Sequence, residues 1–190
     1  MCKEWYGTTV KQFSSYRDIL ALEDVDAVMI ASPDHHHSVQ LEATAKARKH
    51  VYVEKPMARN MKELTTAVDA VKAADIVVQV GTQTRSLPTS TGCHELWKSG
   101  LLGKASRIEQ CRNGAKPYWY GYVKAHLPKS ADVRKEDVDW KEFLGDAPKR
   151  PFSADVLTGW YGYLDYTDGP VTNLGCHFID LYSYITGAQF

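Results

Sequence analysis

A Glu-Lys-Pro sequence at residues 54–56 provides the first group in this chain that could take part in a reaction. It directly follows a short apolar stretch, so we expect the Lys55 ammonium to project from the edge of a sheet into a crevice. A lysine there can bind an anionic or hydroxyl-bearing group, and desolvation lowers its pKa toward a range useful for proton transfer. The alternative is a solvent-facing loop lysine without a chemical role.

A second group lies in the sequence Asn-Leu-Gly-Cys-His-Phe-Ile-Asp at residues 173–180. If residues 175–186 are helical, at about 100° per residue, then His177, Asp180 and Tyr184 share one face. A carboxylate three residues from an imidazole can fix its tautomer or raise its pKa, which would make an acid–base pair. The alternative is a helix-cap network under an interface. The opposite, apolar face contains Phe178, Leu181, Tyr182 and Ile185.

Three consecutive histidines, His35 to His37, suggest a metal site at first sight. Adjacent side chains on a helix point about 100° apart, and no carboxylate or cysteine pattern completes a ligand set, so we expect no metal. Asp34 is interpreted as the N-cap of the helix that follows. The free N–H groups of that helix's first turn would favour a nearby phosphate or ribose oxygen.

Aromatic residues gather at 117–122 and 160–163. Flat aromatic faces flanked by hydroxyl groups suit sugar rings, but core packing or a subunit interface explains them equally well.

The elements that must position these groups alternate between strand and helix. Residues 25–32, 50–53 and 76–80 are predicted strands, and the first contains an unbroken apolar run typical of a strand buried on both faces. Helices are predicted from residue 38 to about 48, and after Asn60, which forms a capping box with Glu63. This order is typical of a doubly wound parallel sheet, whose ligands bind at the carboxyl ends of the strands.

Those predicted carboxyl ends contain residues 32–37, 54–56 and 81–83, which together form a polar rim along one edge of the sheet. Further helices are predicted at 15–23 and 91–99, with Gly100 as the stop of the second. A strand follows at 105–112, and residues 113–155 show no clear period. We therefore expect a second, substrate-binding region after about residue 100.

Composition excludes several classes of protein. The chain has 190 residues, of which 44% are hydrophobic and 11% aromatic, so it can bury a core. Lys and Arg number 23, as do Asp and Glu, so there is no basic surface for nucleic acid. The four cysteines show no CxxC spacing, which argues against a zinc ribbon. No apolar run approaches the roughly 20 residues of a membrane span, and we expect a cytoplasmic protein.

The ordered motifs resemble those of the Gfo/Idh/MocA family, named after glucose-fructose oxidoreductase, inositol dehydrogenase and rhizopine catabolism. The matching motifs are Ser32-Pro33 followed by His37, then Glu-Lys-Pro about twenty residues later, and then Gly175-x-His177-x-x-Asp180. Matching stretches cover most of the chain. The resemblance implies a Rossmann domain that binds NAD or NADP. It also implies an α/β domain with an open, mostly antiparallel sheet that holds the substrate and often forms the oligomer interface.

The resemblance also implies roles for individual residues. Lys55 would lie near the nicotinamide and the reacting hydroxyl, His177 would be the acid–base group for hydride transfer, and Asp180 would assist it. The residues expected to face the cofactor are Ser32, Pro33, His37, Glu54, Lys55 and Gln83.

The sequence departs from the family pattern in two places. Many of these dehydrogenases have an aspartate four residues before the histidine, where this chain has Asn173, so Asp180 or solvent would have to support His177. No G-x-G-x-x-G turn occurs anywhere in the chain. We therefore expect residues 1–100 to be a partial Rossmann domain without its first βαβ unit, and 101–190 a partial substrate domain. The first strand would then have a bare edge.

The fold class expected is α/β, a partial Rossmann-like doubly wound parallel sheet followed by part of an α+β substrate domain. The function expected is hydride transfer between a nicotinamide cofactor and a sugar or polyol, by a protein that is homo-oligomeric when full length and contacts neither nucleic acid nor membrane. One alternative is an enzyme that uses bound NAD transiently for glycoside cleavage or elimination. Another is an inactive fragment or a module that binds sugar without cofactor.

Overall fold

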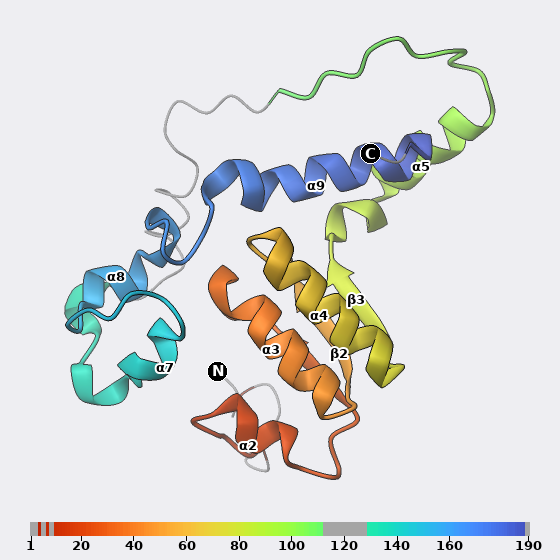
Figure 1. Ribbon diagram of the computed structural model, residues 1–190. Helices are drawn as coiled ribbons and strands as arrows, with labels where there is room; N and C mark the ends of the chain where they lie inside the picture. The colour runs from red at the N-terminus through yellow and green to blue at the C-terminus, as the bar shows by residue number, and fades with distance from the viewer. Residues whose placement is uncertain (1–3, 5–6, 8–9, 112–128, 189–190) are drawn as a thin grey trace.

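Three parallel strands form the sheet of the computed structural model, which describes residues 4, 7, 10–111 and 129–188 (Figure 1). Their order is β1-β2-β3, with bounds Ala27–Ile30, His50–Glu54 and Val78–Gly81. Helix α3 (Asp34–Lys46) connects β1 to β2, and α4 (Met61–Ala74) connects β2 to β3. The predicted alternation of strand and helix and the parallel pairing are therefore confirmed.

Helices α3 and α4 lie side by side on one face of this sheet (Figure 1). The register pairs Val28 with Val51 and Val53 with Val80, so the branched side chains of alternate positions point toward these helices. The resulting core consists of Ile30, Leu41, Val51, Val53 and Ala67. Asn60 caps α4 by accepting a hydrogen bond of 3.0 Å from the Glu63 N–H, which confirms the predicted capping box.

Leu41 of α3 provides a test of this core because its side chain is fully buried against the sheet. Replacing Leu41 with Ala should lower the free energy of unfolding by about 2–5 kcal/mol, through lost apolar burial and the cavity left behind. Urea denaturation measures the change. Leu164→Ala is the matched control, since that side chain is 79% exposed and its loss should cost less than about 0.5 kcal/mol. Equal losses in the two variants would place the core elsewhere.

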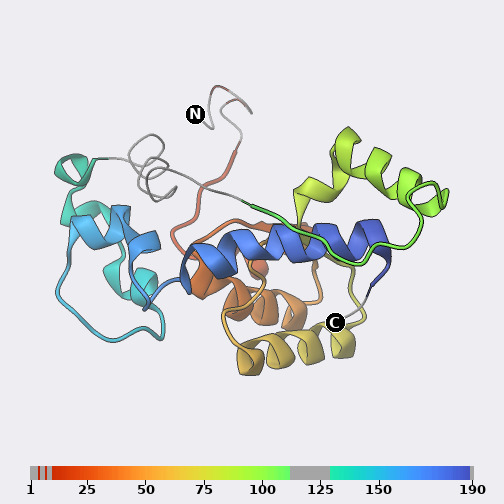
Figure 2. The same ribbon diagram turned by 90° about the horizontal axis from the view of Figure 1, so that it is seen from above.

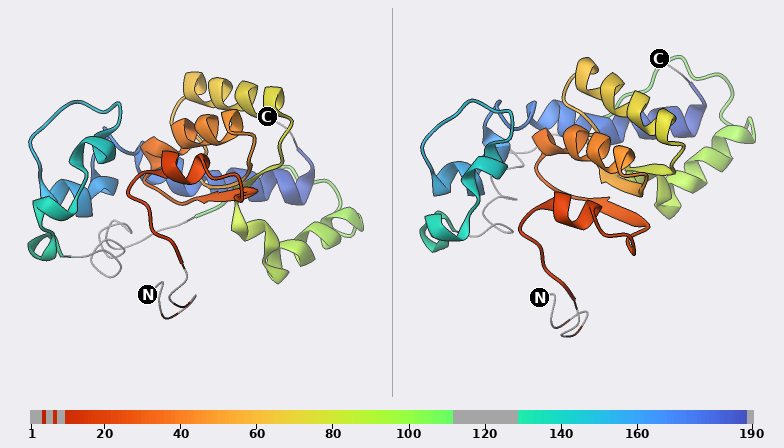
Figure 3. Two further views of the ribbon diagram at one scale, coloured as in Figure 1. Left: turned by 90° about the horizontal axis from the view of Figure 1, so that it is seen from below. Right: turned by 60° about the horizontal axis from the view of Figure 1, so that its bottom comes forward.

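On the opposite face of the sheet, the Met29 side chain of β1 is 68% exposed in the described part of the chain. Strand β1 pairs with β2 and is an edge strand in the described part of the chain. The short helix α2 (Tyr16–Leu20) lies beside β1 and α3, and residues from all three line a cavity of about 90 Å³ (Figure 3). Ser15 caps α2, and the helix ends at Leu20, earlier than the predicted end at residue 23.

A second hydrophobic cluster lies among the short elements after residue 129. It is built on Leu144, Val156 and Tyr166, with Trp140 and Phe143 packed against it. The elements that contribute here are η2 (Ser130–Asp132), η3 (Lys135–Asp137), α7 (Trp140–Leu144), α8 (Ala154–Thr158) and η4 (Trp160–Gly162).

The long helix α9 (Gly169–Thr186) crosses above the edge at which the strands end (Figures 1 and 2). It begins six residues earlier than predicted. Its last turns lie along α5 (Pro88–Lys98), where the His94 and Tyr184 rings stack with centroids 4.6 Å apart. The turn η1 (Gln83–Ser86) joins β3 to α5. Among the described helices, none is long and apolar enough to cross a membrane.

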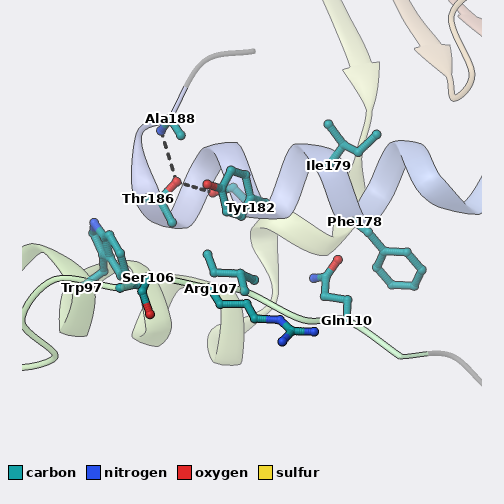
Figure 4. A pocket seen from close by; sticks show the side chains of 11 residues that line it. Trp97, Ser106, Arg107, Gln110, Phe178, Ile179, Tyr182, Thr186 and Ala188 are labelled. Atoms are coloured by element: carbon teal, nitrogen blue, oxygen red, sulfur yellow. Dashed lines mark hydrogen bonds between the residues drawn. The ribbon is translucent and has the colours of Figure 1, made fainter.

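The prediction of a strand at 105–112 is wrong for its described part, 105–111, which belongs to no sheet. A strand needs a neighbour for its backbone N–H and C=O groups, and no such pairing is made by residues 105–111 in the described structure. This stretch instead runs beside α9, and the two enclose a groove of about 530 Å³ (Figure 4).

Candidate active site

Lys55 follows the last residue of β2 and reaches the underside of α9. Its Nζ donates hydrogen bonds to Asn173 Oδ1 at 2.5 Å and to the Asn173 carbonyl at 3.1 Å. Burial lowers the pKa of Lys55, while the Asp34 carboxylate acts against that shift. The lysine is therefore held at the carboxyl edge of the sheet.

A cavity of about 930 Å³ opens between this edge and α9. The sheet side contributes Lys55 and Tyr52, and η1 contributes Gln83 and Arg85. The α9 side contributes Thr172, Cys176 and Asp180. Its size and mixed polar lining are suitable for a small polar molecule.

Glu54 and Gln83 meet at the ends of β2 and β3, as the predicted rim requires. Gln83 Nε2 donates to Glu54 Oε1 at 2.6 Å and to the Tyr52 hydroxyl at 3.2 Å. A Cβ at Gly81 would lie 2.7 Å from the Tyr52 hydroxyl oxygen and 2.9 Å from Glu54 Oε2, so a side chain at this position would displace one or both of these groups. The sequence did not lead us to expect Tyr52 in this cluster. Side chains alternate between the two faces of a strand, however, and this places Tyr52 on the same face of β2 as Glu54.

His37 connects the turns that follow β1 and β2. Its Nδ1 lies 2.7 Å from the Pro56 carbonyl oxygen, its Nε2 lies 2.7 Å from the Ser32 carbonyl oxygen, and the side chain is 2% exposed. Ser32 Oγ in turn donates to Gln40 Oε1 at 2.8 Å. The imidazole therefore braces the Ser32-Pro33 turn from inside the protein. That this turn faces a cofactor stays a prediction.

His35 and His36 contact the second hydrophobic cluster. Their Nε2 atoms lie 2.7 and 2.9 Å from the same acceptor, the Phe143 carbonyl oxygen, and their ring centroids are 3.9 Å apart. Among the described residues, no group of three or more His, Cys, Asp or Glu side chains is arranged to hold a metal ion. The two rings connect α3 to α7.

This connection should make stability depend on pH. Burial lowers the pKa of His35 from its ordinary 6.5 to about 4, with the neighbouring His36 as the next cause, and burial also lowers the pKa of His36. As pH falls from about 6.5 toward 4, the unfolded chain binds protons that the folded histidines resist binding, so the folded state loses stability in that window. Above pH 7 both histidines are neutral in the folded and in the unfolded chain, so they do not change the stability there. The melting temperature of the chain should therefore fall over this range, and should fall less steeply in His35→Asn/His36→Asn. Equal slopes would contradict this assignment.

The interpretation of Asp34 as an N-cap is wrong. Pro33 occupies the N-cap position of α3, and the Asp34 carboxylate faces away from the helix's own backbone toward the start of α9. It accepts hydrogen bonds from Thr167 Oγ1 at 2.8 Å and from Asn173 Nδ2 at 3.1 and 3.2 Å, and it is 3% exposed. Donors from distant parts of the chain bind the carboxylate in place of the backbone N–H groups of α3. The sequence around Asp34 gives no sign of these distant donors.

His177 lies on α9 one turn after Asn173, the residue that holds Lys55. The wall of the cavity contains its neighbour Cys176, so His177 lies on the adjoining face of the helix. Asp180 lines the cavity and forms an ion pair of 3.2 Å, through Oδ2, with Arg85 Nε. Arg85 was not foreseen as the partner of Asp180. The acid–base pairing of His177 with Asp180 stays a prediction.

Of the two aromatic groups, residues 117–122 lie outside the described residues. In the other group, Trp160 and Tyr163 pack against the cluster of Leu144, Val156 and Tyr166. For these two residues the structure favours core packing over a platform for sugar rings.

Two family models together match nearly the whole chain. Residues 2–82 match the model of the oxidoreductase family with an NAD-binding Rossmann fold, and residues 89–189 match the C-terminal alpha/beta domain of the oxidoreductase family. The first match ends at residue 82 and the second begins at residue 89, so η1 lies between them.

Several curated proteins are similar to this chain. Uncharacterized oxidoreductase YrbE of Bacillus subtilis is 28% identical over 131 residues, covering 69% of this chain and 38% of that protein. Myo-inositol 2-dehydrogenase of Thermotoga maritima is 25% identical over 134 residues, covering 70% and 40%. Levoglucosan dehydrogenase of Pseudarthrobacter phenanthrenivorans is 35% identical over 91 residues, covering 48% and 23%. The chain thus spans less than half the length of these relatives.

Solved structures support the same fold. A probable dehydrogenase from Thermotoga maritima gives a TM-score of 0.62 at 21% identity, covering 99% of this chain and 44% of that one. A putative NADPH-dependent oxidoreductase from Desulfitobacterium hafniense gives a TM-score of 0.64 at 23% identity, covering 92% and 41%. Both regions of the chain are therefore arranged as in larger proteins of this fold.

Proposed function

Because this chain belongs to the Gfo/Idh/MocA oxidoreductase family, we propose that it forms the part of an NAD(P)-dependent oxidoreductase that faces the nicotinamide and the substrate. The substrate is a sugar or polyol, one hydroxyl of which exchanges a hydride with the cofactor. Residues 1–100 are proposed as part of the NAD(P)-binding Rossmann domain. Residues 101–190 are proposed as part of the substrate domain.

The observation that supports this proposal best is the hydrogen bond from Lys55 Nζ to Asn173 Oδ1. It joins the end of a Rossmann strand to the helix of the second region, beside a cavity of about 930 Å³. A ligand in that cavity would contact both regions at once, which is where substrates of two-domain enzymes bind. The lysine ammonium then faces the ligand with its orientation already fixed.

The residues present fit one end of a dinucleotide. Glu54 and Gln83 offer a carboxylate and an amide at the carboxyl ends of β2 and β3, where a doubly wound sheet binds its ligand. These groups suit a ribose or a carboxamide. The glycine-rich turn that approaches a diphosphate does not occur in this sequence. We therefore expect this chain by itself to bind NAD or NADP weakly, through the nicotinamide end.

We propose the following roles for the chain's own residues in this reaction. Lys55 donates a hydrogen bond to the reacting oxygen and stabilises the negative charge that develops on it. His177 accepts the hydroxyl proton as general base. Asn173 keeps the Lys55 ammonium in place. NAD or NADP, when bound, supplies the hydride acceptor.

The experiment is a rate measurement with saturating NAD or NADP and a panel of polyols and sugars, including myo-inositol and levoglucosan. Steady formation of reduced cofactor that depends on one of these compounds is the expected result. Cleavage of a nitrophenyl glycoside with catalytic NAD and no net reduction would instead identify an enzyme that oxidises its substrate transiently. Sugar binding that no cofactor alters, without turnover, would identify a binding module.

We also propose that the whole protein is a cytoplasmic homo-oligomer, as the sequence and the family resemblance lead us to expect. Size-exclusion chromatography with light scattering tests the oligomer. Cell fractionation tests the location.

A further inference from the structure

Asp34 is a buried carboxylate, and Asn173, one of the two residues that donate hydrogen bonds to it, also accepts a hydrogen bond from Lys55. It lies at the first residue of α3, directly after the turn that ends β1. Thr167 Oγ1 donates to Oδ2, and Asn173 Nδ2 donates to both carboxylate oxygens. Burying a carboxylate costs free energy unless hydrogen-bond donors compensate for the lost water. A carboxylate buried with such donors therefore suggests a specific role for Asp34.

Asn173 lies between this carboxylate and the Lys55 ammonium. Its Nδ2 is 3.1 Å from Asp34 Oδ2, and its Oδ1 is 2.5 Å from Lys55 Nζ. A carboxylate only accepts hydrogen bonds and an ammonium only donates them, so just one of the two amide orientations satisfies both neighbours. The charge on Asp34 therefore selects the orientation in which Asn173 presents its oxygen to Lys55.

We propose that Asp34 is a positioning residue, which acts through the Asn173 amide to fix the Lys55 ammonium and favour its charged form. This role rests on the proposed function, because only there does Lys55 contact substrate. Electrostatics agree with the geometry. Burial lowers the pKa of Lys55, and the acidic groups near it that oppose this shift are Asp34 on α3, then Cys176 on α9 and Glu54 on β2. Burial also raises the pKa of Asp34, while Thr167, Asn173 and the charges of His37 and Lys55 lower it.

Asp34→Asn is the variant that removes the charge at nearly constant volume. The new amide can donate to Asn173, which then turns its own NH₂ group toward Lys55, so the ammonium loses its side-chain acceptor and keeps the Asn173 backbone carbonyl. Competitive acetylation over a range of pH measures the reactivity of the Lys55 amine. The reactivity profile should move to lower pH, with about tenfold more free amine at neutral pH for each unit of downward shift.

Two further variants make this test specific. The exchange Asp34→Asn/Asn173→Asp moves the carboxylate next to Lys55 and keeps every donor matched to an acceptor, so Lys55 reactivity should return to the wild-type level or below it. Glu42→Gln removes a carboxylate of α3 whose described partner is Lys46, and should leave Lys55 unchanged. A folded Asp34→Asn chain whose Lys55 profile stays within about twofold of wild type would overturn the proposal.

If Asp34→Asn does not fold, the wild-type chain still provides a test by NMR. As the Asp34 carboxyl titrates, the side-chain amide resonances of Asn173 and the Nζ resonance of Lys55 should shift together. A shift of the Asn173 amide signals with no shift of the Lys55 Nζ resonance would overturn the proposal. Neither measurement uses cofactor or turnover, so a chain that reduces no nicotinamide but shows these shifts would contradict the proposed function and leave the positioning role intact.

Discussion

Lys55→Met should reduce kcat/KM for polyol-dependent reduction of NAD or NADP by about 10²–10³-fold, the usual cost of removing one oriented donor to a developing oxyanion. The side chain keeps its length and apolar stem but loses the ammonium that Asn173 holds. Most of the loss should appear in kcat, because the bond to the reacting oxygen strengthens as charge develops. Initial rates at saturating cofactor measure the effect.

Lys46→Met is the matched control for this prediction. Lys46 is an exposed lysine on α3 that pairs with Glu42 at 2.6 Å and lies outside the cavity lining, so its loss should leave turnover unchanged. Melting temperatures of both variants show whether they remain folded. A folded Lys55→Met chain with wild-type kcat/KM would remove Lys55 from the reaction.

His177→Ala should lower kcat by about 10²–10⁴-fold, the contribution typical of a general base, while cofactor affinity stays close to wild type. The physical reason is that the proton of the reacting hydroxyl loses its acceptor, whereas the rim of Glu54 and Gln83 is untouched. Turnover rates and a fluorescence titration with NADH separate the two effects.

His94→Ala is the corresponding control, since His94 stacks on Tyr184 between α5 and α9 and has no proposed role in the reaction. It should retain turnover. Equal losses of turnover and cofactor binding in His177→Ala would show that this histidine supports the fold of α9 and does not act as the base.

Local patterns were sufficient to predict the scaffold of the site. The apolar run before Ser32, the capping box of Asn60 and Glu63, and the alternation of strand and helix each depend on neighbouring residues, and each appears in the structure. The carboxyl ends of parallel strands meet at one edge of the sheet, which predicts that Glu54 and Gln83 lie together, as they do.

Contacts between distant parts of the chain could not be predicted in this way. Asp34 has the sequence of a helix cap, but burial beneath α9 and the donors Thr167 and Asn173 give it a different role. Arg85 and Asp180 are paired only because α9 crosses η1. The expected strand at 105–112 failed for a related reason, since a strand exists only where a neighbouring strand completes its hydrogen bonds.

The most direct test of the proposed site is a map of where the cofactor touches this chain. Backbone NMR spectra of the chain are recorded while NADH and a polyol are added to high concentration, which detects weak binding as well as strong. The account predicts that the largest shifts occur at the carboxyl ends of the strands, at Ser32, Glu54, Lys55 and Gln83, and at the start of α9. Shifts confined to the groove between residues 105–110 and α9, or shifts that are the same at every part of the surface, would contradict it.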